Sequence, residues 1–104
     1  MTRILLACSA GISTSLIVEK MKKIAKEQNK DYKIWATAVE NILDDDEPFD
    51  VVLIGPQVSS KFDRVVEITQ EFGDDIPVGV IEKEDYGRMR AEKILAEAEK
   101  LLGK

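Results

Sequence analysis

Apolar residues occur along this chain in short blocks, and their spacing changes from one block to the next. Largely continuous apolar runs at residues 3–7 and 51–54 are typical of strands that a parallel sheet buries on both faces. A further apolar run at residues 78–81 follows a proline. Residues 33–37 instead alternate between apolar and polar character, which favours a half-buried strand at a sheet edge. The pattern therefore predicts four short strands.

Between these strands, apolar residues recur every three or four positions, which is the spacing of a helix with one buried face. The pattern predicts helices at about residues 13–29 and 60–72, the second of them capped by Gly73. A last helix carries apolar positions from Met89 onward and stops at Gly103.

Strands that alternate with helices predict an α/β fold, with a parallel sheet and helices on both of its faces. Right-handed crossovers make 2-1-3-4 the economical strand order, with the alternating strand at an edge. Ligands of such sheets bind beyond the carboxyl ends of the strands, where the strand order reverses. That point lies between the first and third strands, so Cys8 and the turn Gly55-Pro56-Gln57 are expected to border one crevice.

Composition limits the class of protein. The chain has 104 residues, 44% of them hydrophobic, and a net charge of −5, which fits one globular domain. Its basic residues do not cluster among aromatic ones, so nucleic-acid binding is not expected. No apolar run is long enough to span a membrane. The first strand begins close to Met1, so no signal peptide is expected, and a single unpaired cysteine agrees with a cytoplasmic location.

Two further features limit the chemistry. The chain has no histidine, which removes Cys–His and Ser–His dyads and histidine-based metal sites. The acidic run at residues 44–47 lacks the glycine-containing spacing of an EF-hand. We therefore expect a solvated turn there, and no metal site.

Cys8 is the only cysteine, and it stands where the first strand gives way to a loop of small residues and a helix. A lone cysteine is usually a small buried apolar residue, but this context favours a function. The N–H groups of such a loop and of the first helical turn converge and stabilise negative charge. Gly11 can adopt a positive φ, and Thr14 and Ser15 can cap the helix or donate hydroxyl hydrogen bonds. The candidate loop consists of Ser9, Ala10, Gly11, Ile12, Ser13, Thr14 and Ser15.

Other phosphate-binding loops do not match this one. The nucleotide P-loop requires two glycines and a lysine before Ser/Thr, whereas this loop has one glycine and no lysine. The glycine-rich fingerprint of dinucleotide-binding folds is absent as well. A receiver domain would carry an aspartate at the end of its third strand, where this chain has Leu53-Ile54-Gly55.

A cysteine-dependent phosphatase is the strongest alternative. Its loop has a cysteine, five residues, an arginine and then Ser/Thr, but here Thr14 occupies the position of the arginine. Without that clamp, transition-state charge is poorly stabilised and a phosphocysteine would be hydrolysed slowly, which suits a phosphoryl carrier. An arsenate-reductase-like redox enzyme would need further cysteines. A plain anion-binding module also remains as an alternative.

The chain resembles the EIIB component of the lactose/cellobiose (chitobiose) family of the bacterial phosphoenolpyruvate-dependent sugar phosphotransferase system. The resemblance covers the whole chain and implies a single EIIB-type domain over residues 1–104, with a fold like that of the low-molecular-weight tyrosine phosphatases. Three motifs carry it: Cys8-Ser9-Ala10-Gly11-Ile12-Ser13-Thr14-Ser15-Leu16, Leu53-Ile54-Gly55-Pro56-Gln57-Val58 and Tyr86-Gly87.

This resemblance implies a phosphocarrier that acts as a protein-phosphohistidine–sugar phosphotransferase. A phosphohistidine of an EIIA partner would phosphorylate Cys8. The phosphocysteine would then pass its phosphoryl group to a sugar bound by the membrane component EIIC, expected to be a β-glucoside disaccharide such as cellobiose, chitobiose or lactose. A low-molecular-weight phosphatase-like hydrolase is the alternative.

The resemblance also implies how the site is built. The Cys8 loop would hold the phosphoryl group mainly through backbone amides, without a cofactor. Gln57 and Tyr86 are expected to rim the site; alternatively, Gln57 stabilises its turn and Tyr86 packs against the last helix. The protein would be cytoplasmic, without membrane insertion, and would reach the inner face of the plasma membrane through EIIC.

Overall fold

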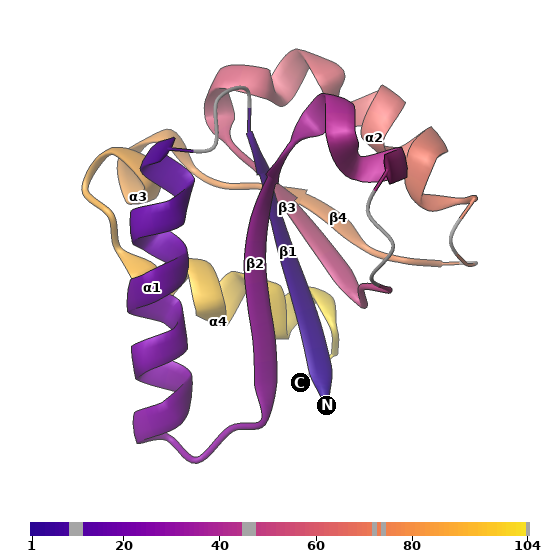
Figure 1. Ribbon diagram of the computed structural model, residues 1–104. Helices are drawn as coiled ribbons and strands as arrows, with labels where there is room; N and C mark the ends of the chain where they lie inside the picture. Colours follow the sequence, from indigo (N-terminus) through magenta and orange to yellow (C-terminus); the bar gives the residue numbers. More distant parts are fainter. Residues whose placement is uncertain (9–11, 45–47, 72, 74, 104) are drawn as a thin grey trace.

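The computed structural model describes residues 1–8, 12–44, 48–71, 73 and 75–103, which form a parallel sheet of four strands with helices around it (Figure 1). The strand order is β2-β1-β3-β4, which confirms the predicted order and the edge position of the alternating strand. The strands are β1 (Thr2–Cys8), β2 (Tyr32–Ala38), β3 (Val51–Ile54) and β4 (Val78–Val80).

Helices cover both faces of this sheet, as the alternating pattern predicted. The α-helices are α1 (Ile12–Glu27), α2 (Phe62–Thr69), α3 (Lys83–Gly87) and α4 (Ala91–Leu101), and the 3-10 helices are η1 (Val39–Asp44) and η2 (Pro56–Lys61).

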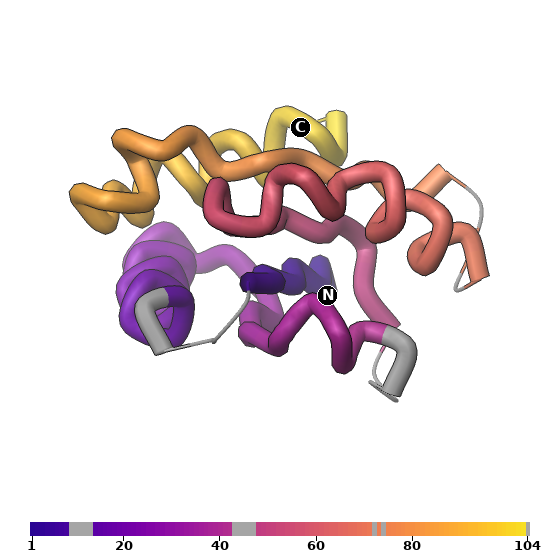
Figure 2. Tube along the Cα trace, turned by 90° about the horizontal axis from the view of Figure 1, so that it is seen from above, coloured from indigo at the N-terminus to yellow at the C-terminus, as the bar shows by residue number. Residues whose placement is uncertain are grey.

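Successive residues of β1 point to opposite faces of the sheet and enter two separate cores. Ile4 and Leu6 pack with residues of α1 and α4, whereas Leu5 and Ala7 pack with residues of η1, η2 and α2. Seen from above, β1 lies between α4 and η1 (Figure 2). Both faces of β1 and β3 are thus buried, which explains why their sequences are continuously apolar rather than alternating.

The structure adds a short helix that the pattern did not predict, α3, before the predicted last helix, which is α4 and begins at Ala91 rather than Met89. Met89 separates them with a φ of 53°, a left-handed backbone that turns the chain. The turn is held by Arg90, whose backbone N–H donates to the Asp85 carbonyl at 2.9 Å and whose guanidinium lies 3.5 Å from the Asp85 carboxylate. As a result, Tyr86 lies on a short helix of its own.

The predicted helix at residues 60–72 is also shorter in the structure. The chain forms η2 first, and α2 begins only at Phe62. It ends at Thr69, whose hydroxyl donates to a carbonyl of its own helix at 2.8 Å, and Gln70 rather than Gly73 is the C-cap. Residue 72 and residues 45–47 of the acidic run lie outside the described part of the chain. Within the described ranges, no helix is both long and apolar enough to cross a membrane.

Candidate active site

Cys8 is the last residue of β1 and is buried, with 3% of its surface exposed. It pairs with Ala38 of β2 on one side. On the other side, the backbone N–H of Gly55 donates to the carbonyl of Ala7 at 2.8 Å, which fixes the end of β3 beside the end of β1. The thiol therefore lies at the carboxyl end of the sheet, at the reversal of strand order that the topology predicted.

Gly55 is the point where the predicted site residues from three segments meet. A Cβ atom on Gly55 would lie 3.4 Å from Cβ of Cys8, 3.1 Å from Oε1 of Gln57 and 3.5 Å from Cε2 of Tyr86. Gly55 has an extended backbone, with φ −67° and ψ 151°, so its role is to leave room rather than to permit an unusual turn. The structure thus brings Cys8, Gln57 and Tyr86 around one small space.

Thr14 joins this group from the first turn of α1. Its side chain is buried, with 1% of the residue exposed, and its Oγ1 lies 3.4 Å from Oη of Tyr86. Ser15, the next residue, is exposed. The N–H groups of the first turn of α1 have no acceptor within the helix and carry the positive end of its dipole, so this end of α1 favours an anion.

The remaining residues of the predicted loop are described only in part. Ser9, Ala10 and Gly11 lie outside the described residues, and Ile12 and Ser13 are described by their backbone in α1 alone. Their contribution to phosphoryl binding therefore stays a prediction.

Tyr86 reaches the site because α3 is separate from α4. The tyrosine is half-buried, its ring packs against the core between the sheet and helices α1 and α4, and its hydroxyl meets Thr14. Tyr86 thus packs against the core that α4 shares and also lies near Thr14 and Gly55, so its role at the site stays a prediction. The motif Tyr86-Gly87 pointed to this residue, but no signal in the sequence pointed to its contact with Thr14.

Among the cavities that described residues line, two lie near the carboxyl end of the sheet. One, of about 230 Å³, is lined by Pro56, Gln57 and Lys83 and therefore adjoins the space around Gly55. Lys83, at the start of α3, is exposed and provides a cation beside it.

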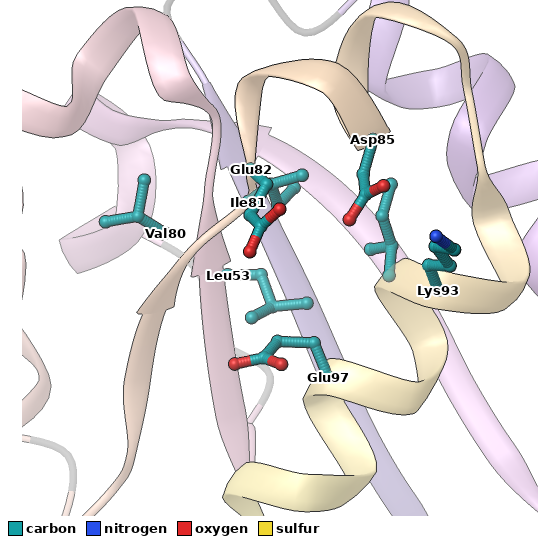
Figure 3. A pocket seen from close by; sticks show the side chains of 8 residues that line it. Leu53, Val80, Ile81, Glu82, Asp85, Lys93 and Glu97 are labelled. Atoms are coloured by element: carbon teal, nitrogen blue, oxygen red, sulfur yellow. The ribbon is translucent and has the colours of Figure 1, made fainter.

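The second cavity, of about 100 Å³, lies between β4, α3 and α4 and includes none of the predicted site residues. Figure 3 shows its carboxylates from Glu82, Asp85 and Glu97, with Lys93 at one end. Three carboxylates against one ammonium repel a phosphoryl group, so this cavity does not compete with the Cys8 site. Among the described residues, no group of three or more His, Cys, Asp or Glu side chains is placed to hold a metal ion.

Comparison with solved structures defines the class of protein. The chain is similar to the cellobiose-specific phosphotransferase IIB component from Borrelia burgdorferi, with a TM-score of 0.76 and 40% identity over 96% of this chain and 90% of that one. It is also similar to the lactose-specific IIB domain from Streptococcus pneumoniae, with a TM-score of 0.78. That second match covers 93% of this chain and 96% of the other, and at 15% identity it shows the fold alone. The fold is the one that phosphotransferase IIB domains share with low-molecular-weight phosphatases.

Comparison of sequences defines the family. The model of the family "PTS system, Lactose/Cellobiose specific IIB subunit" matches residues 3–97, and the chain belongs to this family. A galactose-specific EIIB component from Lactococcus lactis subsp. cremoris (strain MG1363) is 45% identical over 95% of this chain and 94% of its own length. An oligo-beta-mannoside-specific EIIB component from Bacillus subtilis (strain 168) is 37% identical over 98% of this chain and 97% of its own length. The chain is therefore an EIIB component of a phosphotransferase system.

Proposed function

We propose that Cys8 is the phosphoryl carrier of this EIIB component. In the first step, the Cys8 thiolate attacks the phosphorus of a phosphohistidine on EIIA, so that an S–P bond forms, the N–P bond breaks and the imidazole leaves. In the second step, a hydroxyl oxygen of a sugar bound by EIIC attacks the same phosphorus. The S–P bond then breaks and the thiolate is restored, while the hydroxyl proton passes to a base outside this chain's loop.

The observation that carries this proposal is the position of the one thiol of the chain. Cys8 lies at the carboxyl end of β1, which precedes α1 in the chain, and it shares the space at Gly55 with Gln57 and Tyr86. Helix-start N–H groups stabilise the charge of a phosphoryl group without a metal or a cofactor. The absence of histidine fits a donor that supplies its own histidine from another protein.

A second observation favours a carrier over a hydrolase. The loop position that holds the phosphate-clamping arginine in cysteine phosphatases is occupied by Thr14, which is buried and paired with Tyr86. A neutral hydroxyl pair stabilises developing negative charge less than a bidentate guanidinium does. The phosphocysteine is therefore expected to survive until an acceptor arrives, and a phosphatase activity is the weaker alternative.

The remaining parts of the proposal follow from the family. Backbone amides of Ala10 to Ser15 hold the phosphoryl oxygens, Thr14 and Ser15 add hydroxyl donors, and Gln57 and Tyr86 rim the site. Residues 1–104 form one EIIB domain, which works in the cytoplasm and meets EIIC at the inner face of the membrane. The sugar is a disaccharide of the lactose or cellobiose type, and EIIC rather than this chain selects it.

The test is the intact mass of the tag-free protein after incubation with phosphoenolpyruvate, the general phosphotransferase proteins and a matching EIIA. The protein has to be free of a histidine tag, which could itself carry a phosphoryl group. Since the chain has no histidine, an acid-labile adduct on the tag-free protein cannot be a phosphohistidine. We expect one phosphoryl group on Cys8 that disappears when EIIC membranes and sugar are added.

Cys8→Ser is the matched control, since it changes one atom and should leave the fold intact. An unaltered adduct on this variant would refute the assignment of Cys8. Rapid release of phosphate from an aryl ester by the unmodified protein, without an adduct from EIIA, would favour the hydrolase instead.

A further inference from the structure

Two threonines are buried polar residues among the described part of the chain, and their hydroxyls are bonded in different ways. The hydroxyl of Thr69 donates to the Val66 carbonyl of its own helix at 2.8 Å, which is an ordinary local arrangement. The hydroxyl of Thr14 instead lies 3.4 Å from that of Tyr86, 72 positions away in the sequence. A buried hydroxyl that meets a second hydroxyl at the candidate site suggests a role beyond capping.

The Thr14–Tyr86 contact is long for two hydroxyl groups, whose oxygens usually approach to about 2.7–2.8 Å. Each hydroxyl has one proton and two acceptor positions, so either group can donate to the other. If Tyr86 donates, Thr14 keeps its own proton for a different acceptor. A phosphoryl group on Cys8 would be the strongest acceptor in this space, because it is charged.

We propose that Tyr86 is a positioning residue for phosphoryl transfer: it donates a hydrogen bond to Thr14 and so directs the Thr14 proton to a phosphoryl oxygen on Cys8. This inference rests on the proposed function of Cys8. No bond between heavy atoms forms or breaks in the relay, and both hydroxyls keep their protons. The relay stabilises the phosphocysteine without a positive charge, which is consistent with the missing arginine.

The structure places Tyr86 near the carrier residue, and electrostatics gives the direction of the hydrogen bonds. The ring edge of Tyr86 and Cβ of Cys8 lie 3.5 and 3.4 Å from the position of a Cβ on Gly55, so the tyrosine and the phosphoryl-accepting residue border the same small space. A charged acceptor at one end of a chain of hydroxyls also polarises each hydroxyl toward it, which strengthens both hydrogen bonds.

The experiment is a double-mutant cycle on Tyr86→Phe and Thr14→Val. The quantity measured is the equilibrium constant for phosphoryl transfer from phospho-EIIA to this chain, read from intact masses at fixed EIIA. We expect Thr14→Val to lower it about tenfold, which corresponds to about 1.4 kcal/mol. Tyr86→Phe should lower it about threefold to tenfold in the original chain, and less than twofold in the Thr14→Val background.

Equal effects of Tyr86→Phe in both backgrounds would overturn the relay, because a ring that only packs acts whether or not the threonine hydroxyl is present. Thr14→Ser keeps the hydroxyl and should restore the sensitivity to Tyr86→Phe. Tyr32→Phe is the matched control: it removes a tyrosine hydroxyl from the first residue of β2, where that hydroxyl binds Glu99, and should leave the transfer constant unchanged.

If Thr14→Val does not fold, the ³¹P resonance of the phosphocysteine in Tyr86→Phe decides the question. The relay predicts a shift relative to the unmodified chain that Tyr32→Phe does not produce, and an unshifted resonance contradicts it. A failure of the proposed function is distinguishable from a failure of the relay. If the proposed function is wrong, the original chain takes up no phosphoryl group on Cys8 at all.

Discussion

Gly55→Ala should separate function from stability, because the methyl group enters the site without disturbing the core. The methyl carbon would lie 3.1 Å from Oε1 of Gln57, which is tight, and at ordinary contact distances of 3.4 and 3.5 Å from Cys8 and Tyr86. Alanine adopts the extended backbone of Gly55 without strain. The close neighbour is the far end of a flexible and exposed side chain, so only Gln57 has to move.

The expected magnitudes follow from these contacts. Replacing glycine by alanine at a compatible backbone position stabilises a protein by about 0.4–1 kcal/mol through the unfolded state, which offsets the tight contact. We therefore expect the melting temperature to change by less than about 5 °C. Phosphoryl transfer should slow by about tenfold to a hundredfold, since displacements of about 1 Å near reacting groups have effects of that size.

Gly79→Ala is the matched control, with the opposite expected outcome. Its methyl carbon would lie 2.7 Å from Cδ1 of Leu101 and 3.1 Å from Cδ2 of Leu53, on the side of the sheet that α4 covers. Overpacking of this kind costs about 1–3 kcal/mol, and the partly exposed Leu101 can yield, so we expect the lower half of that range. The melting temperature should fall by about 4–8 °C for each kcal/mol, while transfer by the folded protein stays unchanged.

The assay is single-turnover transfer from phospho-EIIA, followed by rapid quenching and intact mass, with thermal unfolding measured on the same samples. If Gly55→Ala transferred at the original rate, the space around Gly55 would not be part of the reaction path. The same conclusion would follow if Gly79→Ala slowed transfer as much as Gly55→Ala at a temperature where both are folded.

Three further predictions concern other parts of the molecule. Burial, with the hydrogen bond to Glu99, raises the pKa of Tyr32 to about 12. The contribution of Tyr32 to folding stability is therefore complete below about pH 10 and is lost as the pH rises toward 12. Tyr32→Phe should cost about 1 kcal/mol at pH 8, and its difference from the original chain in denaturant unfolding should vanish by pH 12. The hydrogen bond from Arg3 holds the pKa of Asp50 below its usual value of about 3.9. Asp50→Asn should therefore cost about 1 kcal/mol of stability at pH 7, and this cost should shrink as the pH falls below 4. A difference in unfolding free energy between variant and original chain that stays constant across the acid titration would contradict this. Leu16 on α1 is 57% exposed beside the candidate site, so Leu16→Ala should raise the KM for phospho-EIIA about fivefold to tenfold without changing stability. Lys22→Ala on the same helix is the control and should change neither the KM nor the stability.

Local pattern was sufficient to predict the sheet and the position of the thiol. The run at residues 51–54 is β3 with the predicted bounds, and the alternating run is the edge strand β2. Buried parallel strands have to be apolar on both faces, so their sequences identify them directly. Once the strand order followed from right-handed crossovers, the position of Cys8 at the carboxyl end of β1 followed as well.

Helix boundaries were less predictable, because they depend on single backbone conformations and caps. Met89 adopts a left-handed φ although it is not a glycine, and this one turn separates α3 from α4. Gly73 looked like a helix cap in sequence, but α2 had already ended at Thr69. The type of amino acid at a position only weakly restricts such backbone conformations when tertiary contacts compensate for their energetic cost.

Only the tertiary structure brought the hydroxyls of Thr14 and Tyr86 together and left the space at Gly55 open beside Cys8. These contacts join residues that lie on β1, α1, α3 and the end of β3, far apart along the chain. Periodicity reports whether a residue faces the core or the solvent, but it carries no information about which residue of another element it meets. The sequence by itself therefore determined the scaffold and the position of the candidate nucleophile, whereas the packing of α3 against the start of α1 decided which side chains surround it.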